Sequence, residues 1–303
     1  MNKKIIFGLI LMFNFEILAD CQDSNVLAKQ MVDKLFNDSV PIAQIIENNS
    51  LGHHAYTHPD HNKIEIKNFL NDNECKVNLV HEYTHRLRYK YQINDTPWFS
   101  EGLAQLAEMH YTSWPKFYST IFSLNPYFML SNVKDKYTND SRSYPESFFL
   151  LNYIYSHFGN QQLLIKMMRS SKTGWDNILS SIRQLQQEQK INLGDKVITR
   201  EFIIKHFAIA LAINDSYLAD YRLFEINPFF IPIIKQNISR IDVNKTYITD
   251  AKFSDFTILF SKHKIEKTES FDIVYAIESL EPFILKSNIT DDKDSEIYIY
   301  IKL

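Results

Sequence analysis

The stretch HEYTHRLRYKYQINDTPWFSEGLAQLAE, residues 81–108, contains two histidines four positions apart and, further on, two glutamates seven positions apart. In a helix, residues i and i+4 lie on one face one turn apart, so His81 and His85 can present two imidazoles to one metal ion. Zinc suits such ligands, and a catalytic zinc site keeps three protein ligands and one open position. Glu82 lies about 100° around the helix from His81. It would therefore sit beside the ion, where a general base belongs.

The second half of the stretch predicts a third ligand. A turn containing proline ends the first helix, and a second amphipathic helix is expected over 98–110. The large apolar residues Trp98 and Phe99 precede Glu101, which indicates a buried carboxylate in need of a partner such as a metal ion. Glu108 lies two helical turns after Glu101 and could accept the ring N–H of a ligand histidine. The alternative is that both glutamates are solvated helix residues.

Together these residues resemble the gluzincin metallopeptidases, in which HExxH, a linker and a glutamate on a second helix build the zinc site. The form WxxEGxAxxxE is closest to the aminopeptidase N-like branch and its small bacterial peptidase MA-like relatives, and the short linker favours the small relatives. The resemblance covers roughly residues 52–185. It implies one zinc ion per chain, bound by His81, His85 and Glu101, and hydrolysis of a peptide or protein substrate in which zinc activates a water molecule and Glu82 takes its proton.

The resemblance also implies a second catalytic residue beside Glu82. Tyr144 stands before a long helix expected over 145–170, and the family pattern makes it the stabiliser of the tetrahedral oxyanion. A tyrosine in the core or in a turn is the alternative, and the rival donors on the same helix are Tyr153, Tyr155 and His157. A strand over 61–68 would be the sheet edge to which an extended substrate adds by backbone hydrogen bonds.

Two other kinds of function remain open. The chain could be a catalytically weak or inactive peptidase-fold module that binds peptide or cell-wall material, although the presence of Glu82 favours an enzyme. It could also hold a structural zinc ion, but such a site would be expected to fill its fourth position with cysteine or histidine.

The beginning of the chain reads as an export signal. A short positive start precedes an apolar run at 5–15, which is too short to span a bilayer, and Ala19 is a plausible cleavage position. Residues 1–19 are therefore expected to be a signal peptide, which places the mature protein in the periplasm or outside the cell. No transmembrane segment is expected after its removal.

The two cysteines fit an exported protein. Cys21 and Cys75 most simply form one disulfide, with two free thiols as the alternative. A lipid on Cys21 is less favoured, because Asp20 occupies a position where lipid attachment requires a small residue.

Composition excludes several partners. The formal net charge is −3, no long basic run is present, and the six glycines form no GxGxxG or phosphate-binding loop. Neither nucleic acid nor a nucleotide cofactor is therefore expected. The substrate and the oligomeric state are not specified by the sequence.

The overall pattern predicts an α+β chain. A zincin-like catalytic domain over 20–215, with a small sheet, the HExxH helix and a mostly helical second half, is expected to precede a β-rich, sandwich-like domain over 216–303.

Four histidines lie close together in the segment 53–61, and they are expected to be exposed, with a second metal site as the alternative; they are His53, His54, His58 and His61. Further expected elements are helices at 24–37, 41–48, 176–189 and 200–213, and strands near 253–260, 271–277, 283–289 and 296–303.

Overall fold

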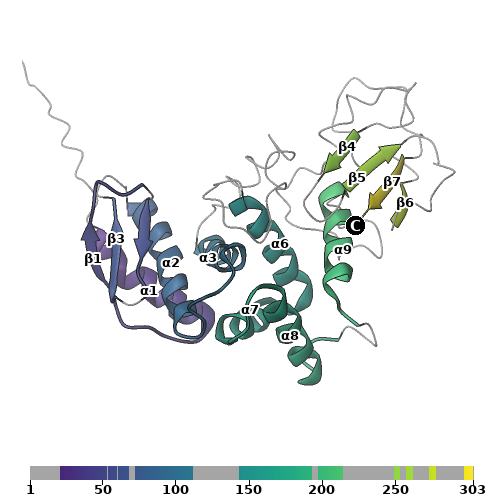
Figure 1. Cartoon of the computed structure of the whole chain (residues 1–303). Coiled ribbons are helices and arrows are strands. Elements are labelled where there is room, and N and C mark those ends of the chain that lie inside the picture. Colours follow the sequence, from purple (N-terminus) through teal and green to yellow (C-terminus); the bar gives the residue numbers. More distant parts are fainter. Residues whose placement is uncertain are drawn as a thin grey trace, which may run out of the picture.

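The computed structural model describes residues 21–52, 54–59, 61–67, 72–111, 143–192 and 197–213, and the backbone of four strands between 249 and 302. These residues form a mixed α and β chain that is mostly helical and contains a small three-stranded sheet (Figure 1). Within the described part, no helix is both long enough and apolar enough to cross a bilayer. The expected signal peptide at 1–19 lies outside the described residues.

Helix α1 (Cys21–Phe36) packs along helix α2 (Asp72–Tyr89), which contains the HExxH motif. Cys21 and Cys75 are buried and form a disulfide between these helices, with their Cα atoms 5.5 Å apart. The bond joins residues 54 positions apart in the sequence. A cysteine in this bond has no free thiol to carry a lipid.

The buried face of α1 contains Ala28, Val32 and Phe36, which are spaced four residues apart as expected for one face of a helix. Val26 and Leu27 lie off this face and are about half exposed. The amide of Asn25 is also buried and donates to the carbonyl of Ala43 (2.9 Å), so α1 is tied by a polar contact to the segment ahead of β1.

The small sheet corrects two expectations. It consists of β1 (Gln44–Glu47), β2 (Ala55–Thr57) and β3 (Lys63–Ile66) in the order β1-β3-β2, with β1 parallel and β2 antiparallel to β3. Residues 41–48 were expected to be helical, but Ile45 and its neighbours pair with β3 instead. The strand expected at 61–68 is therefore central, and β2 is an edge strand lying against α2.

Among the described residues, five helices follow the HExxH helix: α3 (Pro97–Tyr111), α6 (Ser143–Phe158), α7 (Asn160–Arg169), α8 (Gly174–Gln187) and α9 (Arg200–Ile213). The break expected at Gly159 is confirmed, and its φ of 135° favours glycine. Helix α3 lies between α2 and α6 (Figure 1). Gly102 permits this approach, because a Cβ there would lie 2.6 Å from Leu151 Cδ1 and 3.0 Å from the carbonyl oxygen of Ser147.

Four strands are described in the C-terminal part: β4 (Thr249–Lys252), β5 (Thr257–Ser261), β6 (Ile273–Ile277) and β7 (Ile297–Lys302). They form an antiparallel sheet in the order β4-β5-β7-β6. Three of them fall where the sequence predicts strands, and β4 was not expected. The strand expected near 283–289 and the domain boundary at 215–216 lie outside the described residues, so the full β-rich domain over 216–303 stays a prediction.

The disulfide generates a stability prediction. Replacing Cys21 and Cys75 together by serine should lower the free energy of unfolding by about 2–4 kcal/mol, because the bond restricts a long loop in the unfolded chain. Urea unfolding of the variant and the wild type measures the difference, after non-reducing peptide mapping has identified the linked pair. Equal stability, or alkylation of both thiols without reduction, would contradict the prediction.

Candidate metal centre

Helix α2 places the two motif histidines side by side. His81 and His85 lie one turn apart, and their Nε2 atoms are 3.0 Å from each other. The neighbouring positions Val80, Thr84 and Leu87 are buried in the core, which fixes the rotation of the helix about its axis. The two imidazoles therefore converge on one point from a helix that cannot easily turn.

Helix α3 brings Glu101 to the same point. Its Oε2 lies 3.2 Å from His81 Nε2, and its Oε1 lies 3.4 Å from His85 Nε2. Ligands held about 2.0–2.1 Å from a tetrahedral ion are about 3.3 Å from each other. The distances of 3.0, 3.2 and 3.4 Å are close to that value. Among the described residues, these three form a group whose ligand atoms all lie within 4.8 Å of one another.

One oxygen of this group has no hydrogen bond of its own. Oε2 of Glu101 is buried and accepts no hydrogen bond in the described structure. Burial alone would raise the pKa of Glu101, but the adjacent His85 and His81 outweigh it and lower the pKa well below its usual range. A buried, ionised oxygen that faces two imidazole nitrogens is a suitable ligand for a cation.

Each histidine has a partner for its other ring nitrogen. Nδ1 of His81 lies 2.5 Å from Oε1 of Glu108, which lies on α3 two helical turns after Glu101. Nδ1 of His85 lies 3.0 Å from the hydroxyl of Ser100. When Nδ1–H donates to these oxygens, each Nε2 keeps its lone pair directed at the shared point, as in metal-binding histidines generally.

Ser100 was not anticipated from the sequence. Serine is common in the first turn of helices, so its type alone indicates nothing. The available signal is its position directly before Glu101, since a helix that delivers a ligand also brings the neighbouring residue close to that ligand's partners. Its contact with His85 completes a symmetric arrangement in which α3 supplies one oxygen to each histidine.

The carboxylate of Glu82 lies beside the histidines. It is 6% exposed, and this burial raises its pKa, an effect that the nearby His81 and His85 partly offset. Its carboxylate also accepts a hydrogen bond from the backbone N–H of Thr57. Thr57 belongs to β2, so the edge strand of the small sheet reaches the candidate centre. That contact joins residues 25 positions apart and has no local sequence signal.

The aromatic candidates on α6 occupy different environments. Tyr144 belongs to the first turn of α6, but its side chain lies outside the described residues. Tyr153 is fully buried against Phe207, so it is a core residue rather than an open donor. Tyr155 packs against His110, with ring centroids 5.1 Å apart. His157 lies on the same helix as a neighbour of Tyr153.

The loop histidines do not join the centre in the described structure. His54 and His61 are exposed, as expected. His58 is partly buried, and its Nε2 lies 3.6 Å from Oε1 of Glu65. His53 lies outside the described residues. In the described part of the loop, no group of ligand atoms as close as that of His81, His85 and Glu101 is found.

Comparisons with known proteins leave the centre to be interpreted from its own geometry. No family model matches the chain, and no curated protein matches its sequence.

Glu108 and Ser100, which contact the outer ring nitrogens of the two histidines, are expected to contribute to metal affinity. Glu108→Gln and Ser100→Ala should each weaken zinc binding by about 10–100-fold, because such partners orient the ligand rings. Competition with a fluorescent chelator measures the affinity, and Glu188→Gln, at the exposed residue directly after α8, provides a control of the same chemistry. If both variants bind zinc as tightly as this control, the contacts are not part of a metal centre.

Proposed function

We propose that this chain is an exported, zinc-dependent peptidase of the gluzincin type that hydrolyses peptide bonds in peptide or protein substrates. The observation that supports the proposal most strongly is the meeting of His81, His85 and Glu101 within 3.0–3.4 Å, with Glu82 buried beside them. Two imidazoles and one carboxylate from two helices are the ligand set of catalytic zinc in this class of site.

The composition of the centre favours a catalytic ion over a structural one. Structural zinc is almost always held by four cysteine or histidine ligands, whereas catalytic zinc keeps three protein ligands and an open position. Cys21 and Cys75 are bonded to each other and supply no thiolate. The set of two histidines and one glutamate, partly open to solvent, fits the catalytic kind.

In the proposed mechanism, these three residues would hold a zinc ion, which would supply Lewis acidity to lower the pKa of a water molecule and to polarise the scissile carbonyl. Glu82 accepts the proton of the attacking water and returns it to the leaving amine. Its burial favours this role, since a raised pKa brings a carboxylate closer to the operating pH of a proton shuttle. The N–H of Thr57 orients the carboxylate.

The edge strand β2 supports an extended substrate. Its pairing with β3 uses one side, and the sheet order β1-β3-β2 leaves the other side at the edge. A peptide added there by backbone hydrogen bonds would run past Glu82, because Thr57 of this strand contacts that carboxylate. The sequence assigned the substrate-binding edge to the strand at 61–68, and we now assign it to β2, residues 55–57.

Export is part of the proposal. The apolar start of the chain and the disulfide between Cys21 and Cys75 both agree with an oxidising compartment, the periplasm or the exterior. The disulfide also favours an unlipidated mature protein, since lipid attachment would require the thiol of Cys21.

A binding module without turnover is the second candidate, and Glu82 separates the two. Glu82→Gln should retain zinc and the fold but lower the rate of peptide hydrolysis by about 10²–10⁴-fold, because an amide cannot accept the water's proton. The assay follows cleavage of a denatured protein before and after chelation and after zinc is restored, with Glu188→Gln as control. A wild type that binds zinc but never cleaves would support the binding module instead.

Tyr144 is proposed to stabilise the oxyanion of the tetrahedral intermediate, on the basis of the family resemblance alone. Tyr144→Phe should bind zinc and keep a similar KM while kcat falls by about 10²–10³, the usual cost of losing one such donor. Tyr155→Phe serves as a matched variant from the same helix. Full activity of the first variant and loss in the second would assign the role to Tyr155.

A further inference from the structure

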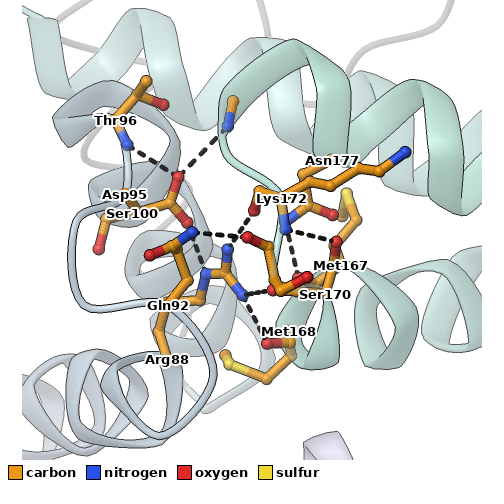
Figure 2. A network of polar contacts seen from close by, with 12 residues as sticks. Arg88, Gln92, Asp95, Thr96, Ser100, Met167, Met168, Ser170, Lys172 and Asn177 are labelled. Atoms are coloured by element: carbon orange, nitrogen blue, oxygen red, sulfur yellow. Dashed lines mark hydrogen bonds and ion pairs between the residues drawn. The ribbon is translucent and has the colours of Figure 1, made fainter.

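Arg88 is the largest fully buried side chain described, and it lies one turn after His85 on α2. Its guanidinium reaches out of the helix toward two other segments (Figure 2). Three of its hydrogen bonds go to backbone carbonyls at the end of α7 and in the following loop, those of Met168 (2.8 Å), Ser170 and Lys172 (2.6 Å). Most of the hydrogen bonds of this buried guanidinium therefore bind the backbone between the end of α7 and the start of α8.

The fourth hydrogen bond of Arg88 goes to Asp95, in the turn between α2 and α3. Nε donates to Oδ2 of Asp95 at 2.5 Å, and both side chains are almost fully buried. The other carboxylate oxygen, Oδ1, accepts the backbone N–H of Thr96 (2.8 Å) and of Gly174 (3.2 Å). Asp95 therefore links the turn to the start of α8 as well as to α2.

That turn leads directly into the residues of the metal centre. The carbonyl of Thr96 accepts the N–H groups of Phe99 (3.1 Å) and Ser100 (3.0 Å), which lie in the first turn of α3. The guanidinium carbon of Arg88 also lies 5.8 Å from the ring centroid of Phe99, two residues before Glu101. Arg88 thus contacts two residues, Asp95 and Phe99, of the segment that leads into Ser100 and Glu101.

The approach of the turn to α8 leaves little freedom. Gly174 has φ of +46°, and a Cβ at this position would lie 2.9 Å from Oγ1 of Thr96. Gln92 adds a parallel connection, since its Nε2 donates to the carbonyl of Ser171 at 2.6 Å (Figure 2). The start of α3 is therefore held against the α7–α8 loop as well as against α2.

We propose that Arg88 and Asp95 are positioning residues of the metal centre, which fix Glu101 relative to the two histidines although neither touches a ligand. The inference rests on the proposed function, because it requires the centre to bind an ion. Its physical basis is that two ligands belong to α2 and one to α3. The spacing of the ligands therefore depends on whatever fixes the start of α3. The planar guanidinium fork makes all four hydrogen bonds at once, which a lysine ammonium cannot do.

The test compares variants that alter this junction with one that does not. Arg88→Lys retains the charge but loses the fork, and Asp95→Asn retains the shape but loses the ion pair. Asn177→Ala is the control, because it removes a buried hydrogen bond to the carbonyl of Met167 (2.9 Å) in the same region without touching the turn or α2. The readouts are the zinc dissociation constant, by chelator competition, and the visible spectrum of the cobalt-substituted protein.

We expect Arg88→Lys and Asp95→Asn to weaken zinc binding by about 10–100-fold and to change the cobalt spectrum, as loss of supporting contacts does at metal sites. Asn177→Ala should lower thermal stability with zinc affinity and spectrum unchanged. If Arg88→Lys does not fold, Asp95→Asn decides, and Gln92→Ala, at a partly exposed position, gives a milder change in the same direction.

Two outcomes would overturn the inference, and they are distinguishable. If the wild type binds zinc and the Arg88 and Asp95 variants match Asn177→Ala in affinity and spectrum, the two residues are structural only and the proposed function stands. If the wild type itself binds no zinc, the proposed function and the positioning role both fail.

Discussion

The closeness of three ligand atoms from two helices is the constraint on which the rest of this structure depends. His81 and His85 on α2 and Glu101 on α3 approach to 3.0–3.4 Å, so the crossing of these helices must be fixed closely. The remaining faces of α2 serve that purpose. Tyr83 donates to Asn25 of α1 and accepts the N–H of Ala43 ahead of β1, and Arg86 donates to the carbonyl of His61 in the β2–β3 turn. Arg88 extends the same principle to the α7–α8 loop.

Charge is the second constraint at the centre. Glu82, Glu101 and Glu108 surround two imidazoles in a region that is only partly open to solvent. Metal binding requires both histidines to be neutral. Three ionised carboxylates would then give the cluster a net negative charge, which is unfavourable in a mostly buried site. In the absence of a cation, the same residues favour a proton on His81: burial lowers its pKa, but the adjacent carboxylates of Glu101 and Glu108 outweigh burial and raise it well above its ordinary value. A divalent cation would replace that proton and offset more of the negative charge.

The parts of the centre that follow from helix geometry could be predicted from the sequence. The spacing of His81 and His85, and of Glu101 and Glu108, fixes their shared faces whatever the tertiary fold. The contacts of Ser100, Thr57 and Arg88 could not be predicted, because each joins segments whose approach no local pattern encodes. The same limit explains why the helix predicted at 41–48 and the sheet edge predicted at 61–68 were wrong. Residues 44–47 have no strong period of their own, and only the parallel pairing with β3 makes them a strand and moves the sheet edge to β2.

X-ray absorption at the zinc edge of the zinc-loaded protein tests the central claim most directly. The account predicts one zinc per chain, with two imidazole nitrogens at about 2.0–2.1 Å and a carboxylate oxygen at about 2.0–2.2 Å, together with a light-atom ligand from solvent. Imidazole scattering should fall by half in His85→Ala. A sulfur shell at about 2.3 Å, an all-oxygen shell, or a spectrum unchanged in that variant would contradict the assignment of His81, His85 and Glu101 as the ligands.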